Sequence, residues 1–292
     1  MSKTGIEWTD RTWNPFLGCR KVSEGCRNCY AERLHETRRQ AKLAGKRLPE
    51  QYARPFSEVQ VPPGRVRAPL RWLKPSRIFV NSMGDFFYEP AVEEFPEVLV
   101  EAWKVMTKAS WHTFQILTKR PETMLSFLEK LRRDHGLGGE PNIWLGVSVE
   151  SQEHLDRIEP LKQAPAAIRF VSFEPLLGPL DGLVPALSGI DWVIVGGESG
   201  PGSRPMHPDW ARSILERAAE AGVMRFFKQW GDWVPDELVA RKNRPIFTFP
   251  DGRRVVRVGK RAAPGHFFGE VVHEWPGGAP SVTQRRRTLM LR

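Results

Sequence analysis

All three cysteines of the 292-residue chain lie within eleven positions, as Cys19, Cys26 and Cys29 in the pattern C-x6-C-x2-C. Thiolates are ligands for zinc and for iron–sulfur clusters, and a C-x2-C pair turns two sulfurs toward one metal. Zinc would need a fourth ligand, which His35 offers in a Cys3His alternative. Three cysteines alone suit a [4Fe-4S] cluster whose fourth iron stays open to a small molecule. The pattern favours this open cluster, and a purely structural cluster is a third reading.

Composition narrows the setting of this metal centre. An odd number of clustered thiols makes a poor disulfide framework, so a reducing compartment is expected. No apolar run approaches the length of a membrane span, and the first ten residues lack the apolar core of a signal peptide. We therefore expect a cytoplasmic globular protein with no membrane partner.

The positive charge is concentrated at the C-terminal end. The chain carries a net charge of +10, and residues 241–292 contain twelve Lys or Arg against three Asp or Glu. Residues 244–258 predict two strands around a Pro-Asp-Gly turn, with basic residues exposed on the second strand. The sequence thus predicts a basic C-terminal extension, which is either a solvated tail with a packed hairpin or an arm that grips a polyanion.

Apolar, β-branched or aromatic runs recur between segments with helical spacing. The predicted strands are residues 77–81, 113–118, 142–149, 168–173, 191–195 and 224–228, with a possible first strand at 5–8; the predicted helices are 92–108, 121–132 and 208–221. Continuous apolar strands that alternate with helices indicate parallel β-α units. We expect a complete or partial β/α barrel, with an open doubly wound sheet as the alternative.

Polar or glycine-rich residues follow nearly every predicted strand. They are the segments 81–85, 118–120, 148–150, 172–175, 196–200 and 228–230. In β/α barrels the chemistry lies in the loops after the carboxyl ends of the strands. We expect these segments to converge on one rim with the cysteine loop, although any one of them is equally suited to capping a helix or making a turn.

Eight blocks in consistent order carry a family resemblance. They are Trp13–Cys19, Gly25–Ala31, Met83–Asp85, Leu117–Pro121, Leu145–Val149, Ser172–Leu176, Gly196–Gly200 and Phe227–Gly231. Over about residues 5–235 the chain resembles the phage-associated three-Cys-motif proteins, a largely uncharacterised family. It also looks like a divergent relative of the radical S-adenosylmethionine superfamily. It departs from that superfamily in two ways: the usual cysteine spacing there is C-x3-C-x2-C, and the residue before the last cysteine is usually aromatic, whereas here it is Asn28.

The resemblance implies roles for individual residues. Cys19, Cys26 and Cys29 would bind the cluster; Gly84, Asp85, Arg120, Ser148, Glu150, Gly196, Gly197, Glu198 and Ser199 would bind S-adenosylmethionine; Lys119 and Glu174 would be catalytic, with Glu7 and Asn14 as weaker candidates. For each residue other than the cysteines, an ion pair or a cap at a strand end is an equally good reading.

The implied activity is reductive cleavage of S-adenosylmethionine followed by hydrogen abstraction from a substrate. The basic C-terminal region, the phage association and the tryptophans Trp13, Trp111, Trp230 and Trp233 favour a nucleic acid or nucleotide substrate, in repair or modification. A reductase or flavodoxin-like protein would supply electrons. The expected domains are a barrel over 1–232 and a basic hairpin and tail over 233–292. The alternative function is a metal-stabilised nucleic-acid-binding protein without radical chemistry.

Overall fold

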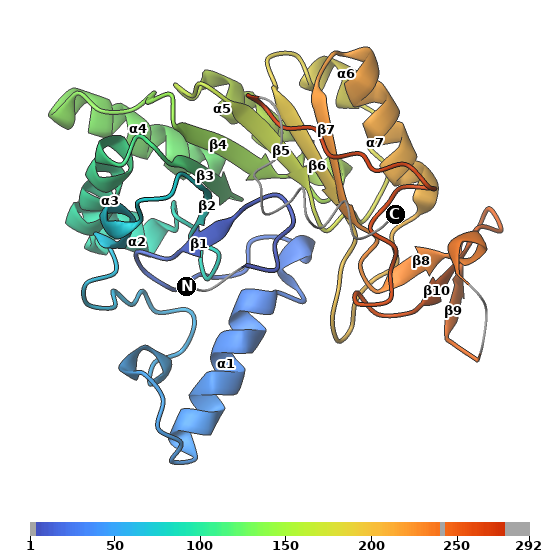
Figure 1. Ribbon diagram of the computed structural model, residues 1–292, viewed down its shortest axis with the longest axis horizontal. Coiled ribbons are helices and arrows are strands. Elements are labelled where there is room, and N and C mark those ends of the chain that lie inside the picture. The colour runs from blue at the N-terminus through green and yellow to red at the C-terminus, as the bar shows by residue number, and fades with distance from the viewer. Residues whose placement is uncertain (1–3, 240–242, 278–292) are drawn as a thin grey trace. The chain divides into compact units, whose positions relative to one another are not determined.

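Seven parallel strands alternate with helices along the chain in the computed structural model, which describes residues 4–239 and 243–277 (Figure 1). The strand order is β1-β2-β3-β4-β5-β6-β7, so each strand neighbours the next one in sequence. Among the described residues β1 and β7 are the two ends of that order. The prediction of an α/β fold of the partial-barrel type is therefore confirmed.

Six of the sheet strands and the predicted helices 121–132 and 208–221 agree closely with the structure, whereas the predicted helix 92–108 is divided at Phe95 into two helices. The sheet strands are β1 (Arg11–Trp13), β2 (Arg77–Val80), β3 (Thr113–Thr118), β4 (Ile143–Ser148), β5 (Arg169–Phe173), β6 (Trp192–Gly196) and β7 (Met224–Gln229). The helices are α1 (Tyr30–Leu43), α2 (Glu89–Glu94), α3 (Pro96–Lys108), α4 (Pro121–His135), α5 (Ile158–Gln163), α6 (Leu183–Ala186) and α7 (Pro208–Glu220). No described helix is long and apolar enough to cross a membrane.

The chain divides into two units, each described here by itself. The described part of the first comprises residues 4–147 and 163–168, and that of the second comprises 148–162, 169–239 and 243–277. In the first unit α3 and α4 both begin with proline, which suits the first turn of a helix, and bury one apolar face each. Helix α4 ends at Gly136, whose φ of 66° provides the left-handed cap.

The first strand differs from the sequence prediction. Residues 5–8 form a turn, and the strand that pairs with β2 is Arg11–Trp13. Trp8 is nevertheless buried, with its ring 4.8 Å from that of Phe79. Trp8 is therefore apolar because it packs against Phe79 of β2, whereas β1 is recognisable only through its pairing with β2.

The second unit contains β5, β6 and β7, covered by α7, and a smaller sheet. The three strands share a core of large aromatic side chains, among them Phe170, Trp192 and Phe226, none of which is exposed. The smaller sheet has the order β8-β10-β9, with β8 (Trp233–Pro235), β9 (Ile246–Thr248) and β10 (Arg254–Arg257) all antiparallel. The predicted hairpin over 244–258 is thus present, with β8 as an additional strand.

The basic residues of the hairpin are paired with acids of the same unit. Arg254 lies 3.3 Å from Asp236, and Arg257 lies 3.4 Å from Asp232. Both side chains are 38% exposed, so the second strand of the hairpin presents basic residues that are partly exposed and also paired with acids. The basic tail over 278–292 lies outside the described residues.

Candidate functional site

The cysteine loop between β1 and α1 contacts the loop after β2 backbone to backbone. Gly18 has a φ of 121°, and a Cβ there would lie 2.6 Å from the carbonyl oxygen of Glu58. A Cβ on Gly84 would lie 2.7 Å from the carbonyl oxygen of Gly18. Such distances exclude any side chain at either position without backbone movement. The two glycines therefore hold the first cysteine at the carboxyl ends of β1 and β2.

The second and third cysteines share one turn immediately before α1. The amide of Cys26 donates to the carbonyl of Ser23 at 2.9 Å, and the amide of Cys29 donates to the carbonyl of Cys26 at 3.2 Å. Cys29 is the residue that precedes the first turn of α1. All three thiols are free and half-buried. The spacing C-x2-C is thus built as a turn that ends in a helix.

Arg120 links the first cysteine to the end of β3. Its Nη1 lies 3.5 Å from the sulfur of Cys19, and its Nη2 donates to the carbonyl of Arg20 at 2.9 Å. The same guanidinium lies 3.1 Å from Asp85 and 2.7 Å from Glu89. Because the side chain is only 4% exposed, these contacts are made away from water. Arg120 therefore fixes the cysteine loop through a buried guanidinium that makes four hydrogen bonds.

Asp85 is the acceptor around which this arrangement is built. One carboxylate oxygen accepts from the hydroxyl of Thr118 at 2.7 Å and from the amide of Phe87 at 3.0 Å. The other accepts from the amide of Lys119 at 3.0 Å and from Arg120 at 3.1 Å. The structure thus brings the predicted residues Gly84, Asp85, Lys119 and Arg120 together with Cys19. Asp85 serves them as an internal anchor.

Burial controls the ionisation of the thiols. Desolvation, helped by the carboxylate of Asp85, raises the pKa of Cys19 from 9.0 to about 12, and desolvation also raises the pKa of Cys29. Desolvation would lower the pKa of Arg120, but Asp85, Cys19 and Glu89 raise it above its ordinary value. A coordinating metal deprotonates a thiol outright. Burial thus favours the neutral thiols of Cys19 and Cys29, and a metal centre bound there would deprotonate them.

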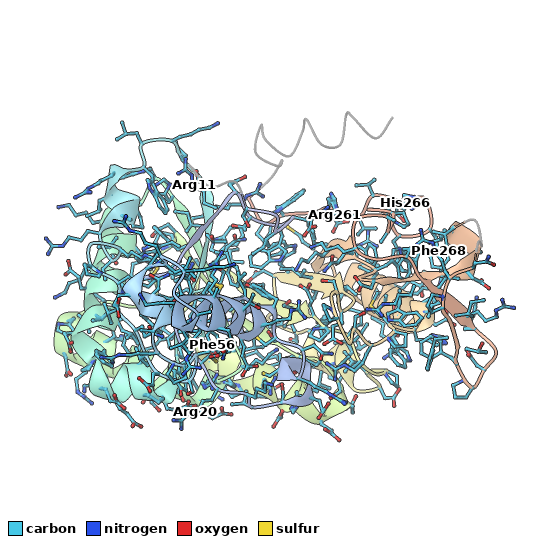
Figure 2. All side chains as sticks on the ribbon, turned by 90° about the horizontal axis from the view of Figure 1, so that it is seen from below. Arg11, Arg20, Phe56, Arg261, His266 and Phe268 are labelled. Atoms are coloured by element: carbon cyan, nitrogen blue, oxygen red, sulfur yellow. The ribbon has the colours of Figure 1, made fainter. Side chains whose placement is uncertain are left out.

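The arrangement of the thiols differs from a single-ion site. Around one tetrahedral zinc at 2.3 Å, thiolate sulfurs lie about 3.8 Å apart. Within 4–239 and 243–277, the only trio of Cys, His, Asp or Glu ligand atoms all within 4.8 Å of one another excludes the cysteines. His35 is fully buried, with Nε2 2.9 Å from the carbonyl of Arg54 and its ring 5.4 Å from that of Phe56, which Figure 2 labels. Three cysteine thiols are the donor set that a [4Fe-4S] cluster with one open iron needs, and His35 keeps a buried Nδ1 without a hydrogen-bond partner among the described residues.

The weaker candidate Asn14 ties the loops after β1 and β2 together. Its side-chain oxygen accepts from the amide of Met83 at 2.7 Å, and its amide nitrogen lies 3.3 Å from the hydroxyl of Ser82. Glu7 lies in the segment before β1. Asn14 thereby supports the same contact that Gly18 and Gly84 make possible.

In the second unit, the predicted acid Glu150, just after β4, forms an internal ion pair. Glu150 is fully buried, and its carboxylate lies 2.8 Å from Nη1 of Arg157. The same nitrogen donates to the carbonyl of Ser148 at 2.9 Å. Arg157 was not singled out from the sequence, although a cation seven residues after a buried acid is a usable signal.

Glu174, just after β5, meets residues from β7. Its Oε1 lies 2.5 Å from Nζ of Lys228 and 3.3 Å from the amide nitrogen of Gln229. A Cβ on Gly196 would lie 3.3 Å from the carboxyl carbon of Glu174. The absence of a side chain at Gly196 therefore leaves room for this carboxylate above β6.

The remaining predicted residues pack against the segment that follows β7. A Cβ on Gly197 would lie 2.1 Å from the carbonyl oxygen of Trp230. The carboxylate of Glu198 accepts from the backbone amide of Arg204 at 2.8 Å and pairs with its guanidinium at 2.7 Å. Ser199 is half-buried in the same loop. Gly197 thus serves close backbone packing, and Glu198 holds the loop.

Asp232 joins this loop to the smaller sheet. Its Oδ2 accepts from the amide of Gly200 at 3.1 Å and lies 3.4 Å from Arg257. Its Oδ1 accepts from the amide of Lys260 at 3.0 Å, and the hydroxyl of Ser203 donates to Oδ2 at 3.2 Å. Sequence reasoning missed Asp232 because its partners are distant in the chain.

Two of the tryptophans considered for base stacking are unavailable for it. Trp13 is 3% exposed, and Trp230 is fully buried, stacked on Phe267 with ring centroids 5.3 Å apart. Trp111 is 41% exposed and Trp233 is half-buried. Only Trp111 and Trp233 remain candidates for contact with a base.

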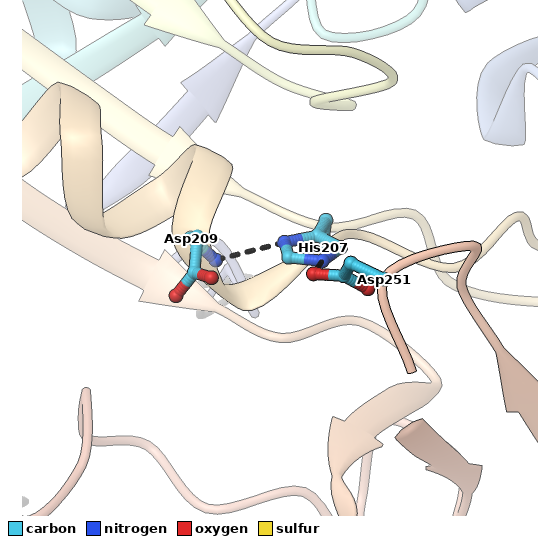
Figure 3. A group of neighbouring side chains, drawn as sticks. All are labelled: His207, Asp209 and Asp251. Atoms are coloured by element: carbon cyan, nitrogen blue, oxygen red, sulfur yellow. Dashed lines mark hydrogen bonds and ion pairs between the residues drawn. The ribbon is translucent and has the colours of Figure 1, made fainter. Parts of the chain in front are cut away.

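A separate cluster of potential metal ligands, His207, Asp209 and Asp251, lies at the start of α7 (Figure 3). Nδ1 of His207 accepts from the amide of Asp209 at 3.1 Å, and Nε2 lies 3.0 Å from the carboxylate of Asp251. Since Nδ1 is an acceptor, Nε2 carries the proton and donates to Asp251. The ring is thus a helix cap and a link to the hairpin turn, and neither nitrogen has a lone pair left for a metal.

Known proteins place the chain in a family without assigning a function. No curated protein matches it. Two solved structures of a cysteine-to-alanine mutant of spore photoproduct lyase are similar in part: the complex with dinucleoside spore photoproduct at 11% identity and a TM-score of 0.40, and the mutant alone at 10% and 0.39. Each alignment covers 83% of this chain and 66% of the other, so the chain spans just under two thirds of their length. The phage association stays a prediction. Residues 3–276 match a single family throughout, and the chain belongs to that family, described as "Protein of unknown function (DUF5131)".

Proposed function

We propose that this chain is a radical S-adenosylmethionine-like iron–sulfur enzyme. It reductively cleaves S-adenosylmethionine and abstracts hydrogen from a nucleic acid or nucleotide, in repair or modification. The observation that carries the proposal is the cysteine loop: three free thiols at the carboxyl ends of β1 and β2, with Arg120 fixing the first of them. This is the rim at which β/α barrels place their chemistry.

The cysteines are the residues that would hold the cluster. Cys19, Cys26 and Cys29 provide three thiolates, which leaves one iron of a [4Fe-4S] cluster open. When bound, the cluster supplies one electron to the sulfonium of S-adenosylmethionine. Burial keeps the free thiols of Cys19 and Cys29 protonated, so loading the cluster releases protons from the loop.

Other residues of the chain would orient the loop and the small molecules. Arg120 holds Cys19, and Asp85 holds Arg120, so both act on the cluster's position. The proposed cofactor contacts are Gly84, Asp85, Arg120, Ser148, Glu150, Gly196, Gly197, Glu198 and Ser199, and the proposed catalytic residues are Lys119 and Glu174. Because Asp85, Glu150 and Glu198 already bond within their own units, we expect them to contribute mainly by shaping the loops that carry them.

The proposal includes two partners. A reductase or flavodoxin-like protein donates the electron. The chain consists of a barrel over residues 1–232 and a basic extension over residues 233–292, and the extension contacts nucleic acid. The charge of residues 241–292 supports the second partner.

Anaerobic purification and metal analysis test the proposal. We expect a brown protein with about four irons and four sulfides per chain, which releases 5′-deoxyadenosine when dithionite and S-adenosylmethionine are added. Cys26→Ala should lose iron and deoxyadenosine together, whereas Thr37→Ala, on the exposed face of α1, should keep both. A colourless protein with one zinc per chain would refute the proposal, and an iron–sulfur protein that never cleaves S-adenosylmethionine would refute its enzymatic part.

A further inference from the structure

A bulge at the end of β7 directs two consecutive side chains to one carboxylate. The register of β6 and β7 runs from Val195 opposite Phe227 to Gly196 opposite Gln229, so one residue of β7 is skipped. A bulge of this kind re-aims a side chain that would otherwise point to the other face of the sheet. Lys228 and Gln229 consequently both reach Oε1 of Glu174, at 2.5 and 3.3 Å.

Ser172 belongs to the same face of the strands. It lies opposite Ile194 in the register of β5 and β6, and Gly196 follows Ile194 by two residues on β6, so Ser172 and Gly196 share a face of the sheet. A Cβ on Gly196 would lie 3.3 Å from the carboxyl carbon of Glu174, so this carboxylate reaches the same face. We define Ser172, Glu174, Lys228 and Gln229 as the β5–β7 polar site. All four belong to the second unit, and Gly196, which has no side chain, leaves room among them for the carboxylate of Glu174.

Two buried atoms of this site have no hydrogen-bond partner among the described residues. Ser172 is 1% exposed and its Oγ is unpartnered; Gln229 is 7% exposed and its Oε1 is unpartnered. A buried polar atom without a partner costs free energy, and native proteins keep few of them. The free energy is recovered when a ligand offers a donor to Gln229 and a partner to the hydroxyl of Ser172.

The charges of the site select an uncharged ligand. Among residues 4–239 and 243–277, Lys228 is the cation that pairs with Glu174, and the two opposite charges offset each other at 2.5 Å. An anion such as phosphate would have to break this pair to be bound. A ligand can therefore bind the acceptor Oε1 of Gln229 and the hydroxyl of Ser172. It can also bind the lone pairs and N–H groups that Glu174 and Lys228 do not use for each other.

We propose that the β5–β7 polar site binds the hydrogen-bonding edge of a nucleobase. The edge of a base carries N–H donors and acceptors side by side without net charge, and enzymes that act on bases read this edge with buried polar groups. The inference rests on the proposed function, for which it names the part of the substrate that is recognised. Ser172 and Gln229 are its contact residues, and Lys228 and Glu174 position Gln229.

Ser172→Ala tests the proposal, because a ligand-binding hydroxyl and a structural hydroxyl have opposite effects on stability. Removing an unpartnered buried hydroxyl should leave the melting temperature of the free protein unchanged or raise it. The same change should weaken binding of the best of four 2′-deoxynucleosides, followed by calorimetry, by roughly three- to tenfold. Gln229→Met should weaken binding likewise.

Ser203→Ala is the matched control. Ser203 is also buried, but its hydroxyl donates to Asp232 at 3.2 Å, so its loss should lower the melting temperature and leave nucleoside binding unchanged. The proposal is wrong if no deoxynucleoside binds, if inorganic phosphate binds as well as a nucleoside does, or if Ser172→Ala lowers stability without weakening binding. Nucleoside binding is measured without S-adenosylmethionine or reductant, and iron content and deoxyadenosine release are measured separately. A failure of base recognition is therefore distinguishable from a failure of the proposed function.

Discussion

Replacing Arg120 by methionine tests the anchoring of the cysteine loop. The substitution keeps most of the side-chain volume and removes a cation that is 4% exposed. Asp85 retains three of its four donors, and Glu89 is 45% exposed and becomes hydrated. Breaking a buried pair costs about 3 to 5 kcal/mol, and the remaining donors place this case near 3 kcal/mol. For a chain of this size the melting temperature should fall by roughly 6 to 12 °C.

The substitution should also affect the cysteine. Arg120 lowers the pKa of Cys19, against the larger effect of burial, so its loss should raise that pKa further. The thiolate becomes less available, and the carbonyl of Arg20 loses its donor. We therefore expect slower iron uptake during anaerobic reconstitution, followed by absorbance. Arg120→Lys should take up iron faster than Arg120→Met but more slowly than the wild type, because lysine keeps the positive charge but lacks the planar, forked guanidinium.

Arg67→Met is the control for this experiment. Arg67 belongs to the same unit and pairs with Glu101 at 2.7 Å, but its side chain is 73% exposed. Exposed pairs contribute little to stability. Arg120 does not anchor the cysteine loop if Arg120→Met melts and takes up iron as the wild type does. The same follows if Arg120→Met and Arg67→Met have equal effects.

Two other predictions concern backbone packing and pH. Gly197→Ala would place a methyl group 2.1 Å from the carbonyl oxygen of Trp230, so it should abolish soluble expression or lower the melting temperature sharply, while Gly265→Ala, with no atom within 4 Å of the added carbon, should melt normally. Burial lowers the pKa of His112 below its ordinary 6.5, so the folded state favours the neutral ring and stability is lost as pH falls below that value. Urea unfolding at pH 7.5 and 5.5 should show this loss, and His112→Gln should show a smaller one; an equal loss in both would exclude His112 as its source.

The sequence predicted the strands and helices well where burial dictates composition. A short continuous apolar run such as residues 191–195, between segments with helical spacing, indicates a strand buried on both faces, and the structure places β6 at Trp192–Gly196. The first strand escaped because Arg11–Trp13 is short and half polar, and its identity comes from pairing with β2. Composition carries no record of such a pairing.

The site was predictable in its loops but only partly in its contacts. Strand-end loops follow from the β/α pattern, which located Asp85, Lys119 and Arg120 before their geometry was known. The contact between Arg120 and Cys19 joins residues 101 apart, and only the order of β1, β2 and β3 brings them together. Lys228 was missed as the partner of Glu174 for the same reason, since the pair depends on β5 and β7 flanking β6.

Asp232 gives the second unit a mechanical coupling. Because one carboxylate bonds both the loop after β6 and Arg257 of the hairpin, a partner that pulls on the hairpin also displaces that loop. Trp233 belongs to the same hydrogen-bond network, because its indole donates to the carbonyl of Ser203 at 2.8 Å. A displacement of the loop would therefore also break or lengthen the hydrogen bond of this indole.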